Sequence, residues 1–270
     1  MRPARAPQTT TRGTRGTRGT RGTRGRARKY IVATMHLFSS FGKEDPRARG
    51  PYRAYRLRLS RREYARSPPS LSLLGDADLL WGNHIRCAVV GSRQASAEGL
   101  ARAEAVAAAC AAAGHVVVSG LAVGVDGAAH RAALANGGPT VAVIPTSLEA
   151  EAWPREHAGL QAEIAARGLV VSQFESPPRP MAKGLVERNT TIALVSCATF
   201  VPEAGERSGA RHVVREALWL GRGVYFHEAV RERLRGVRWL ELAIEAGAEV
   251  YGDADLAEVV VALEGASPMK

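Results

Sequence analysis

From residue 87 onward, short runs of β-branched residues alternate with longer, alanine-rich segments whose apolar positions recur at helical spacing. Buried runs separated by amphipathic helices are typical of βαβ units, in which parallel strands form a sheet covered by helices. The predicted strands are residues 87–90, 116–118, 141–144, 169–172, 198–201, 224–226 and 249–251. The expected fold class is α/β, a doubly wound and mostly parallel sheet with helices on both faces.

The segment after the first predicted strand shows how one of these helices is specified. Ser96 is a residue type that caps helix N-termini, and Gly114 is placed to end the helix. The apolar stripe between them consists of Leu100, Ala103, Val106, Ala107, Cys110 and Ala111. Its alanines allow close packing on the sheet, and ligands of such folds bind at the carboxyl ends of the strands.

The chain divides into two parts of opposite charge. Residues 1–66 contain 19 Lys and Arg against three acidic residues, whereas the remainder is net acidic, so the overall charge of +11 comes from the N-terminal part. Residues 11–25 are five Thr-Arg-Gly triplets without a large apolar group to bury. We therefore expect a disordered or poorly structured basic segment over 1–66 and one domain over 71–265. The repeats either bind nucleic acid without sequence preference, or are unselected, or precede a true start at Met35.

Cysteine usage and hydropathy indicate the compartment. Cys87, Cys110 and Cys197 lie inside apolar segments without Cys-x-x-Cys spacing, which is typical of small core residues in a reducing environment. No run of 18 apolar residues and no apolar leader is present, so we expect a cytoplasmic protein that does not contact membranes. No metal-ligand spacing and no nucleophile with a base stands out, so we expect no metal, no cofactor, no catalytic residue and no enzymatic activity.

The loops after the first two predicted strands carry the candidate binding chemistry. Gly91-Ser92-Arg93 combines a tight turn, a hydroxyl and a guanidinium beside a helix N-terminus, a setting suited to phosphate, although ordinary strand-to-helix turns share these features. In residues 119–127, three glycines allow the backbone to approach a phosphate or another helix closely. This loop is neither a dinucleotide fingerprint nor a P-loop. We expect Asp126 to cap the next helix and His130 to be a partly exposed helix residue.

Two later segments could complete the same crevice. Lys183 and Arg188-Asn189 supply polar and basic side chains, and Ser208-Gly209 precedes a predicted helix, where free amides can hold an anion.

Taken together and in order, these segments resemble the DprA/Smf family of DNA-processing proteins. The matching segments are Gly75-Asp76 with Leu79-Leu80, residues 89–93, residues 119–130, Trp153-Pro154 with Glu156-His157, Arg188-Asn189, Glu203-Ala204 with Ser208-Gly209, residues 221–224 and Gly247-Ala248. The resemblance implies a Rossmann-like domain that binds single-stranded DNA and helps to load RecA recombinase during uptake of transforming DNA. It also implies a homodimer.

The resemblance, with the residue chemistry above, defines a set of candidate DNA and phosphate contacts. They are Gly91, Ser92, Arg93, Ser119, Gly120, Gly124, Asp126, Lys183, Arg188, Asn189, Ser208 and Gly209. The chain departs from the family in three places: residues 185–190 replace Phe-Pro-x-Arg-Asn-Arg, residues 210–214 lose a hydroxyl, and His227-Glu228-Ala229 replaces Val-Pro-Gly. These departures leave open a role other than transformation, for instance in mobile-element or defence settings.

The alternative is a sensor of a nucleotide derivative or a phosphoribohydrolase-like enzyme with the same type of pocket. Phosphoribohydrolases carry Pro-Gly-Gly-x-Gly-Thr-x-x-Glu, whereas residues 202–209 here lack the glycine pair, and Glu216 lies downstream. An open basic groove would favour DNA, and a closed pocket with an inward carboxylate would favour nucleotide chemistry.

Overall fold

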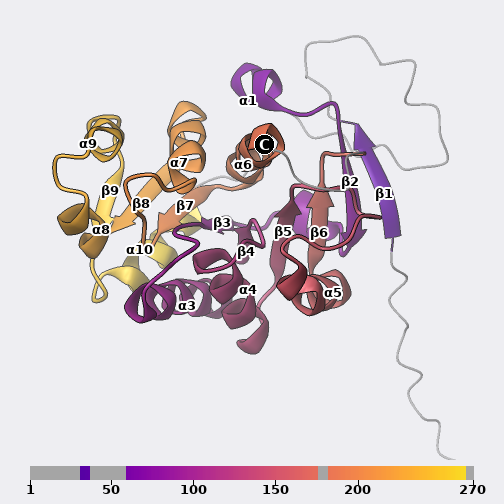
Figure 1. Ribbon diagram of the computed structural model, residues 1–270, viewed down its shortest axis with the longest axis horizontal. Helices are drawn as coiled ribbons and strands as arrows, with labels where there is room; N and C mark the ends of the chain where they lie inside the picture. The colour runs from indigo at the N-terminus through magenta and orange to yellow at the C-terminus, as the bar shows by residue number, and fades with distance from the viewer. Residues whose placement is uncertain (1–30, 37–58, 176–181, 266–270) are drawn as a thin grey trace, which may run out of the picture.

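The computed structural model describes residues 31–36, 59–175 and 182–265, which form a nine-stranded sheet with helices on both faces (Figure 1). The strand order is β1-β2-β6-β5-β4-β3-β7-β8-β9. β2 is antiparallel to β1 and β6, and all other neighbours are parallel. The strands are β1 Ile31–His36, β2 Ser70–Gly75, β3 Arg86–Val89, β4 Val116–Ser119, β5 Thr140–Ile144, β6 Leu169–Ser172, β7 Ala198–Val201, β8 Gly223–His227 and β9 Glu249–Tyr251. The predicted doubly wound α/β fold is confirmed.

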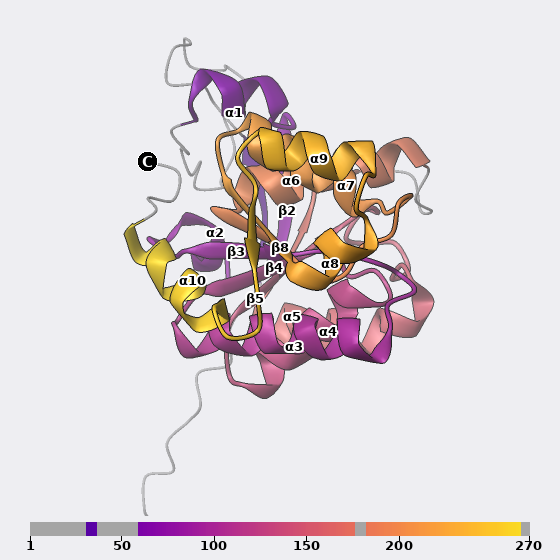
Figure 2. The same cartoon turned by 90° about the vertical axis from the view of Figure 1, so that its left-hand side faces the viewer.

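The helices form two layers, with α3, α4, α5 and α10 on one face and α1, α6, α7 and α9 on the other (Figure 2). Their bounds are α1 Arg61–Arg66, α2 Asp78–Trp81, α3 Ala97–Ala112, α4 Val125–Ala135, α5 Ala158–Arg167, α6 Ala182–Val195, α7 Ala210–Trp219, α8 Glu228–Arg233, α9 Arg238–Glu245 and α10 Leu256–Ala262, with 3-10 turns at Arg155–His157 (η2) and Leu263–Gly265 (η3).

The sheet is buried on both faces because successive strand residues pack into different helix layers. Val117 belongs to the cluster formed with α3 and α4, whereas Val116 and Val118 belong to the cluster formed with α6 and α7. Ser96 caps α3 by accepting a hydrogen bond from the Gly99 amide at 3.0 Å, as predicted. All three cysteines are free and buried, as expected of core residues.

The folded part begins upstream of the predicted boundary at residue 71, because β1 and α1 both lie within residues 1–66. α1 has a capping box, in which Ser60 and Glu63 bond each other's backbone amides. Glu63 also pairs with Arg222, and Arg66 pairs with Glu216 at 2.9 Å. These contacts hold α1 against the body of the domain, which charge composition alone did not indicate. The Thr-Arg-Gly repeats lie outside the described residues.

His130 is fully buried, contrary to the predicted partial exposure. Its Nδ1 lies 2.7 Å from the Thr140 hydroxyl, which donates its own proton to the Val117 carbonyl at 2.9 Å, so Nδ1 is the donor. Nε2 has no hydrogen-bond partner among the described residues. Burial lowers the pKa of His130 to about 3, and the imidazole is therefore neutral at physiological pH.

The topology fixes where a ligand can meet the sheet. From β3 the chain builds outward through β4, β5 and β6, and then returns to place β7 on the other side of β3. The switch point therefore lies between β3 and β7, where loops at the carboxyl ends diverge and leave a crevice.

Candidate nucleic-acid interface

The loops after β3 and β4 are packed directly against each other at the carboxyl edge. Gly124 has φ +79°, and a Cβ atom there would lie 2.3 Å from the Ser92 carbonyl oxygen. The amide of Val125 donates to the same oxygen at 3.1 Å. Only glycine allows this approach. The backbone at Gly124 therefore does come very close to another group, and in this structure that group is the loop after β3.

The second loop is also held at Leu121, a non-glycine residue with φ +59°. Its side chain is fully buried, and its carbonyl oxygen accepts a hydrogen bond from Nδ1 of His157 at 2.9 Å. Non-glycine residues in this conformation cost free energy and persist only where packing and hydrogen bonds enforce them, frequently at functional sites.

Asp126 and Arg188 form a buried pair beneath this loop. The Asp126 carboxylate accepts hydrogen bonds from the amides of Gly120 at 3.1 Å and Ala122 at 3.4 Å, so it closes the loop. The predicted cap of α4 by Asp126 is therefore wrong. Arg188 donates to the Gly120 carbonyl and to the Val143 carbonyl, and its Nη1 lies 3.9 Å from Asp126 Oδ2.

Arg188 is 4% exposed, and its contact with phosphate stays a prediction. Its Nη1 donates to the carbonyls of Gly120 and Val143, so in this structure Arg188 supports the loop. Burial lowers the pKa of Arg188 to about 10, and burial raises the pKa of Asp126 against the opposing effect of Arg188. Arg188 therefore remains a cation at neutral pH.

Arg93 is the exposed member of this group. It lies near enough to act electrostatically on both Asp126 and Arg188. The two arginines together carry more charge than the one carboxylate, which leaves an excess positive charge on the two loops. A free guanidinium in this position can bind phosphate.

Three other predicted contacts serve the loops internally. The Ser119 hydroxyl is buried and donates to the Val89 carbonyl at 2.6 Å, which ties β4 to β3. A Cβ atom on Gly120 would overlap the Arg188 guanidinium, and one on Gly91 would lie 2.4 Å from the Glu203 carbonyl oxygen. These positions require a hydroxyl or glycine for packing, and their contact with DNA stays a prediction.

The remaining predicted residues lie on α6 and at the start of α7. Lys183 is exposed in the first turn of α6 and lies 3.6 Å from Glu187. Asn189 donates to the Gly209 carbonyl at 3.3 Å and thereby joins α6 to the N-terminus of α7. The Ser208 hydroxyl accepts from the Ala210 amide at 3.2 Å.

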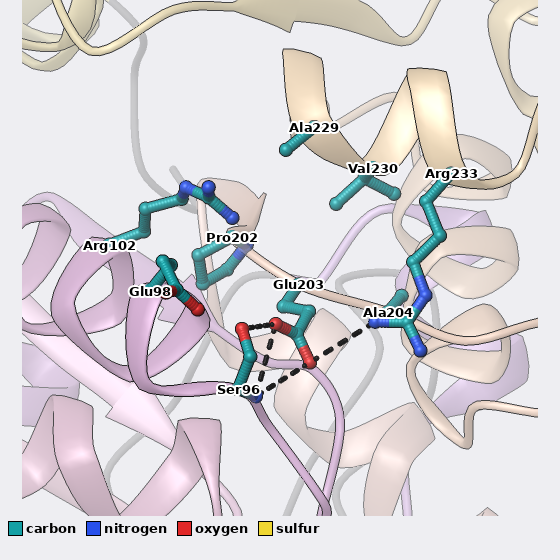
Figure 3. Close-up of a pocket in the computed structure, with 9 residues that line it drawn as sticks. All are labelled: Ser96, Glu98, Arg102, Pro202, Glu203, Ala204, Ala229, Val230 and Arg233. Carbon is teal, nitrogen blue, oxygen red and sulfur yellow. Dashed lines mark hydrogen bonds and ion pairs between the residues drawn. The ribbon is translucent and has the colours of Figure 1, made fainter.

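Glu203 lies at the carboxyl edge of the sheet, and its role there was not predicted from the sequence. A cavity of about 260 Å³ lies at the switch point between the start of α3, the loop after β7, and α8 (Figure 3). The Glu203 carboxylate points into the N-terminus of α3, where it accepts from the Ser96 amide at 3.1 Å and from the Ser96 hydroxyl at 2.5 Å. Arg233 lies 3.6 Å from the same carboxylate.

The protein's own carboxylate thus occupies the anion-binding position that the sequence predicted at the N-terminus of this helix. An inward carboxylate is the feature expected to favour nucleotide chemistry, so the nucleotide alternative stays open. Glu216, the other acidic candidate, is buried elsewhere and pairs with Arg66 and Arg215 at 2.9 Å each.

Within the described ranges, no helix is long and apolar enough to span a bilayer. The same residues contain no cluster of three or more His, Cys, Asp or Glu side chains that could hold a metal ion.

Residues 53–260 match the family model of DNA recombination-mediator protein A. The chain belongs to this family. A DNA processing protein DprA of Mycobacterium tuberculosis is 41% identical over 158 residues, which are 58% of this chain and 40% of that protein. DprA of Streptococcus pneumoniae is 38% identical over 159 residues, or 59% of this chain and 55% of that protein. The chain thus spans about half the length of these curated DprA relatives.

Solved DprA structures share the fold. The X-ray structure of Streptococcus pneumoniae DprA aligns with a TM-score of 0.63 at 32% identity, covering 73% of this chain and 69% of that one. Helicobacter pylori DprA, whose structure is described as showing a single-stranded DNA binding mode, aligns with a TM-score of 0.65 at 24% identity, covering 78% and 95%. The DprA/Smf resemblance predicted from the sequence is confirmed.

Proposed function

We propose that this chain is a cytoplasmic recombination mediator that binds single-stranded DNA at the carboxyl edge of its sheet. The observation that carries the proposal is the exposed Arg93 guanidinium, set over two interlocked loops with an excess of positive charge. Membership of the DNA recombination-mediator family supports a DNA ligand. On the same family grounds, the proposed activity includes protection of incoming single strands and RecA loading during DNA-mediated transformation.

The mode of binding follows from the chemistry of this edge. A guanidinium and backbone amides recognise phosphate oxygens, which every nucleotide presents, so binding should not depend on base sequence. Phosphate contacts release counterions from the strand, so affinity should fall as salt rises. The N-terminal arginines can contribute to phosphate binding in the same way, and the test must reduce their contribution.

Arg93→Ala is expected to weaken binding of a labelled poly-dT oligonucleotide by roughly tenfold and to make its salt dependence shallower by about 0.7 in log–log slope. The measurement is fluorescence anisotropy across a salt series, with duplex DNA as a comparison. Both proteins should be full chains in which Arg12, Arg15, Arg18, Arg21 and Arg24 are replaced by serine. A fragment beginning at Leu71 is unsuitable because it would lack β1 and α1.

Arg167→Ala is the matched control, because Arg167 is a half-exposed arginine that precedes β6 at the opposite edge of the sheet. It should bind like the parent chain. Equal binding by the Arg93 and Arg167 variants at every salt concentration would contradict the proposed site, and no binding by the parent would contradict the proposed function.

We further propose that the protein is a homodimer joined through α7 and α9. A groove of about 550 Å³ lies between these helices, and Trp219 and Leu242 at its surface are 39% and 48% exposed. α7 contributes Arg211 and Arg215 to the groove, and α9 presents exposed glutamates at 241 and 245. In a two-fold arrangement each basic helix would face the partner's acidic one, so the face is complementary to a second copy.

Leu242→Glu is therefore expected to convert the dimer to a monomer in size-exclusion chromatography with light scattering. Val261→Glu, at an equally exposed position on the opposite helix layer, should leave the mass unchanged. A parent chain that is monomeric at tens of micromolar, or a Leu242 variant that stays dimeric, would reject this interface.

A further inference from the structure

Trp153 is a large aromatic side chain left exposed at the edge where DNA is proposed to bind. It lies in the loop between β5 and η2 and is 44% exposed. Its indole makes no hydrogen bond or ring contact within the described part of the chain. Tyr64 and Trp219, also exposed, belong to α1 and α7 on one face of the sheet, whereas Trp153 follows the carboxyl end of a central strand.

The loop that carries Trp153 is fixed to the glycine-rich loop of the site. His157, four residues further on, donates to the Leu121 carbonyl at 2.9 Å. A Cβ atom on Gly127 would lie 2.5 Å from the His157 ring, so α4 and this loop are in close contact. β3, β4 and β5 are adjacent and parallel, so the loops that carry Arg93 and Trp153 leave the same edge of the sheet from strand ends about 10 Å apart.

The neighbourhood of the ring in sequence carries charges of both signs: Glu149 and Glu151 precede it, and Arg155 and Glu156 follow it. Arg131 reaches from α4 to within 3.5 Å of His157 Nε2. Arg155 is 70% exposed in its side chain and is held at 2.6 Å by Glu151. An exposed aromatic ring on an edge that binds a polymer can stack on a base, while arginines elsewhere on that edge bind phosphates.

We propose that Trp153 forms a nucleobase-stacking subsite, two strands away from the phosphate contact of Arg93. This rests on the proposed function. The chain has aliphatic Leu185 and Val186 in the first half of α6, where the resemblance predicted an aromatic-proline pair. An exposed aromatic ring is present instead at Trp153, in the loop after β5.

Trp153→Leu is expected to weaken binding of a labelled (dT)12 by about fivefold to tenfold, because leucine is apolar but has no aromatic face. Trp153→Phe should stay within about twofold of the parent. The salt slope should be the same for all three proteins, since no phosphate contact is lost. All are full chains carrying the five serine substitutions in the repeats, and circular dichroism verifies that each is folded.

An oligonucleotide of the same length with abasic sites separates stacking from phosphate binding. The parent should bind it more weakly than (dT)12 by about the factor that Trp153→Leu loses, and the leucine variant should scarcely distinguish the two strands. Tyr64→Leu on α1 is the matched control and should behave like the parent.

The outcomes distinguish the inference from the proposed function. If the parent binds (dT)12 and Arg93→Ala weakens it, yet Trp153→Leu binds equally well and the parent ignores base removal, the stacking subsite is wrong and the function stands. If the parent does not bind (dT)12, both are wrong.

Discussion

Arg188→Met is expected to lower the free energy of unfolding by about 3–5 kcal/mol, because it leaves the Asp126 carboxylate buried without its cation. The substitution also removes the donor to the carbonyls of Gly120 and Val143. Urea unfolding followed by circular dichroism at pH 7 measures the loss. Removing Arg188 should raise the pKa of Asp126 further, so protonation would relieve the buried charge and the loss should be smaller at pH 5 than at pH 7.

A second substitution tests this cause directly. Asp126→Asn removes the charge but retains an oxygen that can accept from the amides of Gly120 and Ala122, so Arg188→Met with Asp126→Asn should be more stable than Arg188→Met alone. Arg167→Met, at an exposed position, should change stability by less than about 0.5 kcal/mol. If Arg188→Met cost under about 1 kcal/mol while DNA affinity fell tenfold, Arg188 would be a DNA contact after all.

Gly124→Ala is expected to lower the free energy of unfolding by about 2–4 kcal/mol, through backbone strain at φ +79° and a clash with the loop after β3. The new Cβ would lie 2.3 Å from the Ser92 carbonyl oxygen and 2.8 Å from the Arg93 carbonyl oxygen. Separation of the two loops would displace Arg93. Binding of (dT)12 should therefore fall by at least about tenfold, even at a temperature where the variant is folded.

Gly205→Ala is the matched glycine control. No heavy atom would lie within 4 Å of its Cβ, and its φ is outside the positive region, so stability and binding should be nearly unchanged. Normal DNA binding by folded Gly124→Ala would show that the contact between the two loops does not position the DNA site.

Arg188 and Gly124 both fix the position of the loop after β4. The buried pair fixes the loop after β4, and the glycine allows that loop to touch the one carrying Arg93. Loss of groups that support a binding surface would change affinity through the geometry of that surface.

The fold could be predicted because its signal is local and repeated. Each buried parallel strand requires a short β-branched run, and each helix requires an apolar stripe with a cap such as Ser96, so periodicity indicated seven of the nine described strands. β1 and β2 were missed. They form an antiparallel edge, and their placement depends on pairing with β6 across a long sequence separation.

The candidate site shows where sequence information ends. The order of the motifs indicated the family and the loops at the carboxyl edge, because glycines and polar residues at strand ends can be recognised from the sequence without knowledge of the tertiary structure. Whether a guanidinium faces solvent or a carbonyl is set by neighbours distant in sequence: Arg188 is buried against Gly120, 68 residues away, and Glu203 fills the helix N-terminus at Ser96, 107 residues away. The sequence by itself determined seven of the nine described strands, their order and the family. Only the tertiary structure decided which charged groups are satisfied internally and which remain free for a ligand, because burial and hydrogen-bond partners arise when separate segments meet.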